Sequence, residues 1–291
     1  MTSPAASGWP APLLAGLLDD AAVFPPGRAT LPAAVTAHRA HRAAWYRDLV
    51  GPLVLPESAL VELGPLLNRD EPLALAVTLP GGPGGIAGVL DLVAELPIEL
   101  AALEIAVPAD VTVPELIATL DRTLAGTPVE VYVEIPRDDR RETLLAALAG
   151  RYRAKFRTGG VRAELYPDEA ELAAAVSAAI AAGVPFKATA GLHHAVRNTD
   201  PATGFEQHGF LNLLLAAGLA NDAASNGVVA VLAERDGAVL AGRIRELGPD
   251  GLTTARARFD SFGTCSVTEP LDELVELGLL VPATDPEGVP A

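Results

Sequence analysis

The sequence predicts an α/β fold, a (β/α)₈ TIM barrel with an N-terminal helical extension. Eight short apolar runs of strand-like character alternate with Ala- and Leu-rich segments of helical spacing over residues 49–282. Strands that alternate with helices indicate right-handed βαβ units and a parallel sheet. Eight units in about 240 residues match this barrel in number and size. The competing doubly wound sheet is disfavoured because no GxGxxG fingerprint follows the first run.

Each predicted element rests on its own stretch of sequence. The predicted strands are GPLVLP (51–56), LALAVTL (73–79), LAALEIAV (100–107), PVEVYVEI (128–135), YRAKFRT (152–158), PFKATAG (185–191), VVAVLAE (228–234) and ARFDSF (257–262). The predicted helices are 57–67, 84–95, 113–125, 139–149, 168–182, 207–223, a short one at 237–246, and 269–280. We expect residues 1–48 to be a helical extension packed on the barrel, residues 49–282 to form the barrel, and residues 283–291 to be a disordered tail.

Composition narrows the function classes. The net charge is −16, from 21 basic and 37 acidic residues, which argues against binding to nucleic acid or to an anionic membrane surface. The N-terminus lacks the basic region of a signal peptide, and no apolar run is long enough to span a membrane. Cys265 stands alone, so no internal disulfide can form. We expect a cytoplasmic protein with a small-molecule partner, and the sequence leaves the substrate, the reaction direction and a homo-oligomeric state open.

Lysine is almost absent from the chain. Only Lys155 and Lys187 are lysines, whereas 19 of the 21 basic residues are arginine. Lysine differs from arginine chemically because its amine can lose a proton when buried and can form a Schiff base. The two lysines could have been retained by chance. Their scarcity instead favours the interpretation that both stand at sites where arginine cannot replace lysine.

Strand parity places both lysines inside the predicted barrel. Side chains alternate along a strand, so the parity opposite to the bulky apolar residues faces the interior. Four successive strands put charged residues on that face, and a buried ion costs several kcal/mol unless it is paired. A salt-bridge network that only fills the barrel is one interpretation; we favour an active site at the C-terminal ends of the strands. The inward set includes Glu104, Glu130, Tyr132, Glu134, Arg153, Lys155, Arg157, Lys187, Thr189 and Gly191.

These residue types suit carbonyl chemistry. Two ammonium groups held close repel each other, which would lower the pKa of at least one lysine and supply the neutral amine that attacks a carbonyl carbon. Glu104 and Glu134 could then move protons between carbinolamine and imine. We predict lysine Schiff-base aldolase or lyase chemistry, with Lys155, Lys187, Glu104, Glu134 and His193 as catalytic residues.

A family resemblance points the same way. KFRTGG, which contains Lys155, is followed 32 residues later by KATAG, which begins at Lys187. Over residues 150–195 this pair resembles the paired lysine strands of class I deoxyribose-phosphate aldolases, Lys-Thr-Ser-Thr-Gly and Lys-Ala-Ser-Gly-Gly. The resemblance implies that Lys155 forms the Schiff base and that Lys187 perturbs its pKa. Our count places the lysines on strands five and six, whereas the family has them on six and seven. Arg157 also replaces a small hydroxyl residue, and GLHH is not the family's continuation.

The loops after these strands supply candidate substrate contacts. The segment after KATAG carries a His pair, an arginine and a third histidine, all on the predicted catalytic side. Imidazole can donate a proton or a hydrogen bond near neutral pH, although ordinary polar loop residues are the alternative. The predicted substrate-binding residues are Tyr132, Arg157, Gly159, Gly160, Thr189, Gly191, His194, Arg197 and His208.

Two other functions compete with the aldolase interpretation. In the first, a metal-dependent lyase or isomerase, Glu104, Glu134, Glu234 and either His193 or His208 hold a divalent cation. No HxH or HExxH spacing supports it, so we predict no metal and no cofactor for the favoured mechanism. In the second, an inert barrel binds a small anion through Lys155, Arg157 and Lys187.

Overall fold

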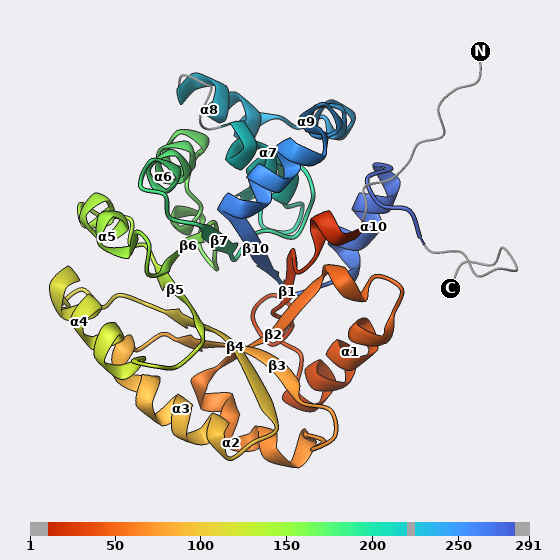
Figure 1. Cartoon of the computed structure of the whole chain (residues 1–291). Helices are drawn as coiled ribbons and strands as arrows, with labels where there is room; N and C mark the ends of the chain where they lie inside the picture. The colour runs from red at the N-terminus through yellow and green to blue at the C-terminus, as the bar shows by residue number, and fades with distance from the viewer. Residues whose placement is uncertain (1–10, 220–224, 283–291) are drawn as a thin grey trace, which may run out of the picture.

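Eight parallel strands close into a barrel in the computed structural model, which describes residues 11–219 and 225–282 (Figure 1). Every neighbouring pair is parallel, and the sheet closes through pairing of the first strand with the last. The predicted (β/α)₈ TIM barrel is therefore confirmed. The strands are, around the barrel, β1 (Leu18–Asp20), β2 (Val50–Pro56), β3 (Leu73–Leu79), β4 (Ile98–Ile105), β5 (Glu130–Glu134), β6 (Arg153–Arg157), β7 (Phe186–Thr189) and β10 (Phe259–Thr264).

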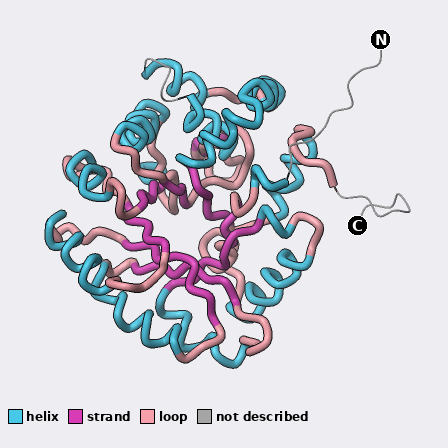
Figure 2. The backbone as a smooth tube through the Cα atoms, in the orientation of Figure 1, coloured by secondary structure: helices cyan, strands magenta, loops and turns pink. Residues whose placement is uncertain are grey.

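Helices surround the strands in an outer ring (Figure 2). Apolar side chains of the ring pack on the outward faces of the strands and form the main core. In the described part of the connection between β7 and β10 there are three helices instead of one. The longest of them, α9, is two helices joined at a kink at Gly248 and Pro249. The helices are α1 (Leu31–Ala43), α2 (Leu60–Leu63), α3 (Ile86–Ala94), α4 (Val113–Thr123), α5 (Arg141–Leu148), α6 (Glu169–Ala181), α7 (Phe210–Leu219), α8 (Ser225–Ala233), α9 (Gly237–Arg258) and α10 (Thr268–Glu276).

Seven of the eight predicted strands are observed, and the prediction for residues 228–234 is wrong. That apolar run belongs to helix α8. A short buried apolar run cannot be assigned to strand or helix from its periodicity alone. The helix is held at its C-terminal end by Asn212 of α7, whose side-chain amide donates to the carbonyl oxygens of Val231 (2.7 Å) and Glu234 (2.8 Å).

The eighth strand comes from the N-terminal segment instead. β1 covers only three residues, and it lies between β10 and β2. Its two aspartates made the segment look unlike a strand, but both are buried with partners on opposite faces. Asp19 points inward, and Asp20 accepts from His38 Nδ1 of α1 at 3.0 Å. The expected boundary at residue 48 is therefore wrong, because residues 18–20 complete the barrel. The predicted disordered tail lies outside the described residues.

The correction renumbers the barrel. Counting from β1, the strand with Lys155 is the sixth and the strand with Lys187 is the seventh. The departure from the aldolase pattern that came from our strand count therefore disappears.

The barrel interior has an apolar sector and a charged sector. Val54, Ala76, Ala102 and Tyr132 of β2 to β5 form a small inner cluster, and Phe24 of the β1–α1 loop packs against it. The charged sector lies across β4 to β7 and β1. Strand parity is thus confirmed for Glu104, Tyr132, Lys155 and Lys187.

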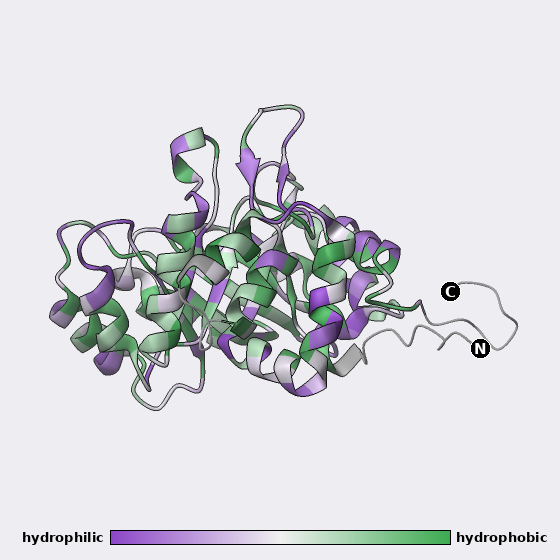
Figure 3. Cartoon of the chain, turned by 90° about the horizontal axis from the view of Figure 1, so that it is seen from above, coloured by the Kyte–Doolittle hydropathy of each residue, from purple (hydrophilic) through white to green (hydrophobic). Residues whose placement is uncertain are grey.

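One small hairpin stands apart from the barrel. β8 (Asn198–Thr199) and β9 (Glu206–Gln207) pair antiparallel within the β7–α7 segment, and they project beyond the helical ring (Figure 3). In the described ranges no helix is long and apolar enough to cross a membrane.

Candidate active site

Five ionisable side chains from five strands meet inside the barrel. They are Asp19 of β1, Glu104 of β4, Glu134 of β5, Lys155 of β6 and Lys187 of β7, and we call them the lysine cluster. The two lysines are direct cross-strand partners. Glu134 is in turn the cross-strand partner of Lys155. The parallel register therefore places Glu134, Lys155 and Lys187 at comparable depth.

Glu104 joins the two lysines. One carboxylate oxygen, Oε2, forms an ion pair with Lys155 Nζ at 2.8 Å, and the other, Oε1, accepts a hydrogen bond from Lys187 Nζ at 2.5 Å. All three side chains are buried. The arrangement differs from the expected pair of repelling ammonium groups, because an anion lies between them.

Asp19 completes the environment of Lys187. It forms a second ion pair with Lys187 Nζ, and the Ser261 hydroxyl of β10 donates to Asp19 Oδ2 at 2.7 Å. Gly51 of β2 makes room for this carboxylate, since a Cβ there would lie 2.2 Å from Asp19 Oδ1. Sequence reasoning missed Asp19 as a site residue because it missed the strand. Its signal was an aspartate within an apolar run.

The pKa values follow from burial and from these partners. Burial disfavours the charged form of Lys187, but Asp19 and Glu104 outweigh it and raise the pKa of the Lys187 amine above its usual range. Burial likewise opposes ionisation of Glu104, yet the two lysines lower its pKa to about 2. The pKa of Asp19 is raised because burial outweighs the attraction of Lys187. The predicted pKa depression of at least one lysine is therefore not found at Lys187, which stays a cation.

Glu134 and Arg157 lie at the exposed side of the cluster. Glu134 Oε2 is 3.1 Å from Lys155 Nζ, and Glu134 Oε1 accepts from Arg157 Nε at 3.2 Å. Burial opposes ionisation of Glu134, but Lys155 and Arg157 hold its pKa below the usual range. The exposed fraction of the side chain rises from 2% at Lys187 and 6% at Lys155 to 23% at Glu134 and 41% at Arg157. Approach from solvent therefore meets Arg157 and Glu134 first, and Lys187 last.

Tyr132 forms the floor beneath Lys187. The ammonium nitrogen lies 5.2 Å from the centre of the Tyr132 ring, within the range of a cation–π contact. The Tyr132 hydroxyl donates to Asp260 Oδ2 at 3.2 Å, and Asp260 is also paired with Arg153 at 2.8 Å. Arg153 pairs in addition with Glu130. These groups form a second layer of ion pairs toward the N-terminal ends of the strands. This layer agrees with the hypothesis of a salt-bridge network that fills the barrel.

The glycines after β6 and β7 hold the two strand ends together. A Cβ on Gly159 would lie 2.9 Å from the Gly191 Cα, so the two backbones meet without room for a side chain. The Tyr166 ring covers both glycines and contacts the Phe205 ring of the hairpin segment, with 5.5 Å between ring centres. Leu165 occupies the space beside Gly160. Thr189 ends β7, and its carbonyl oxygen accepts from the Thr158 backbone N–H at 2.9 Å.

The histidines of the β7–α7 segment separate into two groups. His193 lies near the end of β10, with Nδ1 3.5 Å from Cys265 Sγ, and burial lowers its pKa. His194 pairs with Glu273 of α10 at 2.6 Å. Arg197 pairs with Glu169 and Glu206, while His208 contacts Arg197 and donates from Nε2 to the Pro167 carbonyl oxygen. Among the described residues, none of these hydrogen bonds reaches the lysine cluster.

The predicted metal ligands are not gathered at one point. Glu234 follows helix α8 rather than a strand. The Glu234 Oε1 atom accepts hydrogen bonds from the backbone N–H groups of Arg235 and Asp236. His208 is engaged with Pro167. Within the described residues, no group of three His, Cys, Asp or Glu side chains is arranged to hold a metal ion. The donor set of the metal hypothesis therefore does not fit this site.

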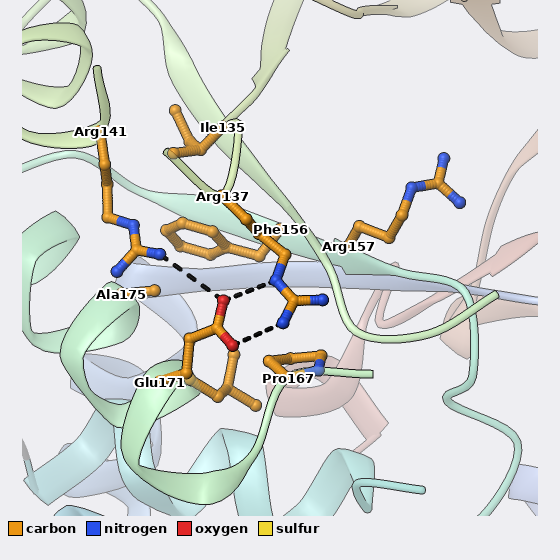
Figure 4. Close-up of a pocket in the computed structure, with 9 residues that line it drawn as sticks. Ile135, Arg137, Arg141, Phe156, Arg157, Pro167, Glu171 and Ala175 are labelled. Carbon is orange, nitrogen blue, oxygen red and sulfur yellow. Dashed lines mark hydrogen bonds and ion pairs between the residues drawn. The ribbon is translucent and has the colours of Figure 1, made fainter. Parts of the chain in front are cut away.

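A small pocket lies outside the barrel, next to β5 and β6 (Figure 4). Arg137 and Arg141 of this pocket both approach Glu171, at 2.5 and 3.8 Å. Its volume is about 20 Å³, enough for about one water molecule. We therefore place the candidate active site at the lysine cluster and not in this pocket.

Comparison with known proteins shows a structural likeness only. No family model matches the chain, and no curated protein sequence matches it. The fold resembles that of a tetrameric deoxyribose phosphate aldolase from Aeropyrum pernix, with a TM-score of 0.53 and 16% sequence identity over 91% of this chain and 93% of that chain. A candidate deoxyribose-phosphate aldolase from Coccidioides immitis gives a TM-score of 0.34 and 9% identity over 92% of this chain and 88% of that chain, a likeness too low to support an argument. The distant resemblance seen in residues 150–195 thus extends to the fold of the barrel.

Proposed function

We propose that this chain is a class I aldolase or lyase that forms a Schiff base between Lys155 and a small carbonyl compound. The observation that carries the proposal is the bridging carboxylate of Glu104 between two buried lysines, 2.8 Å from one Nζ and 2.5 Å from the other. A lysine pair of this kind is expensive to bury, so its retention favours a chemical role. The placement of the lysines on the sixth and seventh strands supports the aldolase resemblance.

Lys155 is the nucleophile in this proposal. It lies nearer to the exposed side of the cluster, whereas Lys187 is enclosed by two carboxylates that keep it protonated. Glu134 takes a proton from the Lys155 ammonium, and the neutral amine attacks the carbonyl carbon. Glu134 returns the proton to the carbinolamine hydroxyl, which leaves as water while the C–N double bond forms.

Lys187 acts through Glu104. Lys187 stays charged beside Glu104, so the single negative charge of Glu104 is shared between two lysines rather than given to Lys155 alone. Asp19 and the Tyr132 ring hold Lys187 in place from the other sides.

We further propose that the protein works in the cytoplasm as a homo-oligomer. The single cysteine and the tetrameric state of the Aeropyrum pernix protein support this proposal.

Borohydride trapping tests the proposal directly. Because the chain has two lysines, reduction in the presence of a carbonyl compound can label only Lys155, Lys187 and the α-amino group. We expect peptide mass spectrometry to find the adduct on Lys155. Lys155→Arg should remove that adduct, and Lys187→Arg should retain it at a reduced rate. Full activity in both variants, or no adduct with any carbonyl compound, would refute the Schiff-base mechanism.

A further inference from the structure

Arg157 occupies a position that bears on the choice of substrate. It is the last residue of β6, two residues beyond Lys155 on the same inward face. Two residues along a strand correspond to about 6.6 Å between Cα atoms. Any group held by Arg157 is therefore close to the carbonyl carbon that Lys155 would attack.

One edge of the Arg157 guanidinium is free. Nε donates to Glu134, while the two terminal nitrogens make no hydrogen bond with any residue that the structure describes. Arg137, Arg141, Arg153 and Arg197, in contrast, each direct a terminal nitrogen at a carboxylate. Figure 4 shows the Arg157 side chain pointing away from the ion pairs of Arg137 and Arg141 with Glu171. A free terminal edge is the part of arginine that binds a planar carboxylate through two parallel hydrogen bonds.

Glu134, which accepts from Arg157 Nε at 3.2 Å, repels any anion that binds beside Arg157. The lysine cluster and Arg157 together contain three carboxylates and three cations, so the charges balance. A bound carboxylate adds one negative charge next to Glu134, whereas a phosphate monoester adds close to two. Repulsion from Glu134 is therefore weaker for a carboxylate.

We infer that the substrate is a 2-oxo acid whose carboxylate binds to Arg157. The inference rests on the proposed function. The Lys155 amine attacks the C2 carbonyl, the C–N bond forms, and one proton moves from the nitrogen to the C2 oxygen. Glu134 returns the second proton, and the C2 oxygen leaves as water while the C–N double bond forms. Glu134 then takes a proton from C3, which gives the enamine. Carbon C3 of the enamine adds to the carbonyl carbon of an aldehyde to form the new C–C bond, and the aldehyde oxygen takes the proton from Glu134 to become a hydroxyl group. Water then hydrolyses the imine and releases the product from Lys155. In the cleavage direction, a 4-hydroxy-2-oxo acid yields the 2-oxo acid and the aldehyde.

The test compares three carbonyl probes by borohydride trapping on the full chain. The probes are pyruvate, propanal and glyceraldehyde 3-phosphate, and the readout is the initial rate of adduct formation on Lys155 by mass spectrometry. We expect the wild type to trap pyruvate. In Arg157→Gln the ratio of the pyruvate rate to the propanal rate should fall ~10- to 100-fold, because a charged hydrogen-bonding pair is lost. Glutamine keeps a donor for Glu134.

Arg162→Gln is the matched control. Arg162 lies in the loop after β6, its side chain is 67% exposed, and its ion-pair partner is the equally exposed Glu164. We expect this variant to trap all three probes at the wild-type rates. Equal pyruvate-to-propanal ratios in wild type and Arg157→Gln would overturn the inference, as would a selective loss of glyceraldehyde 3-phosphate trapping. Trapping of propanal without pyruvate also overturns it but leaves the Schiff-base proposal standing. A wild type that traps none of the probes refutes the Schiff-base proposal itself.

Discussion

Glu104 connects the stability of the protein to pH. Its pKa is about 2 in the folded chain, below the 4.5 of a free glutamate side chain, because two lysines favour the anion. A lowered folded-state pKa contributes stability above the unfolded pKa, and this contribution is lost as pH falls from about 4.5 toward 2. Its size is about 3 kcal/mol. We expect the difference in unfolding free energy between wild type and Glu104→Gln to shrink across this range, as measured by urea denaturation.

A matched variant separates this effect from the general acid sensitivity of the chain. Glu62→Gln changes a helical glutamate of α2 that forms none of the ion pairs found in the described residues. Its difference from wild type should be small at every pH. A Glu104→Gln difference that stays constant between pH 5 and 2 contradicts the expected linkage.

Asp19 and Lys187 form a coupled pair. Lys187→Met removes the cation alone and leaves the buried carboxylates of Asp19 and Glu104 without this partner. Breaking a buried ion pair in this way lowers the free energy of unfolding by about 3 to 5 kcal/mol. Adding Asp19→Asn removes one of the stranded charges. We therefore expect the double variant to be more stable than the sum of the single changes predicts, by about 1 kcal/mol or more in urea titrations. Strict additivity would mean that the two side chains do not interact energetically.

At this scale the sequence predicted the lysines and two of their three carboxylates. Strand parity needs only the alternation of side chains, so Glu104, Glu134, Lys155 and Lys187 could be placed inside the barrel. The ion-pair partners could not be predicted, because they depend on the register between strands that are far apart in the chain. Asp19 and Lys187 are separated by 168 positions in sequence.

Strand β2 carries a glycine that the cluster requires. A methyl group on Gly51 would overlap the Asp19 carboxylate, so Gly51→Ala has to displace β1 or the carboxylate. Overpacking of this kind costs about 1 to 3 kcal/mol. We expect lower thermal stability and, under the proposed function, slower trapping on Lys155.

Gly88→Ala is the appropriate comparison. Gly88 is exposed in helix α3, and a Cβ there meets nothing within 4 Å. Alanine in a helix is favoured over glycine by about 0.5 to 1 kcal/mol. The two substitutions should therefore shift the melting temperature in opposite directions, and a loss of stability from both would argue against the specific clash.

The two wrong elements have one physical cause. The 228–234 run buries Val228, Val231 and Leu232, and its exposed positions Ala230 and Ala233 are also non-polar, so the run has the composition of a buried strand although it forms part of α8, which packs against α6 and α7. β1 has the reverse problem, since two of its three residues are acidic. In both cases tertiary contacts decide the element: Asn212 holds the end of α8, and Lys187 and His38 pair with the aspartates of β1.

The barrel as a whole depends on its N-terminal segment. β1 forms hydrogen-bonded pairs on both sides, so the eight-stranded barrel is incomplete without it. We expect deletion of residues 1–48 to abolish the cooperative thermal transition, because β10 and β2 would then leave exposed edges and Lys187 would lose Asp19. Circular dichroism during heating measures this. A truncated chain with a sharp transition would show that residues 49–282 form a self-sufficient domain.

The place of β1 also sets the order in which the site comes into existence. During synthesis this strand leaves the ribosome before the other strands of the barrel, but its partner β10 follows more than 200 residues later. Pairings between distant parts of a chain form late, since the loop that they close is long. Lys187 therefore gains its Asp19 counter-ion only when β1 has taken its place in the barrel. The complete lysine cluster should therefore form late in folding. A partly folded chain with β2 to β7 in place would hold the two lysines without the Asp19 carboxylate that pairs with Lys187.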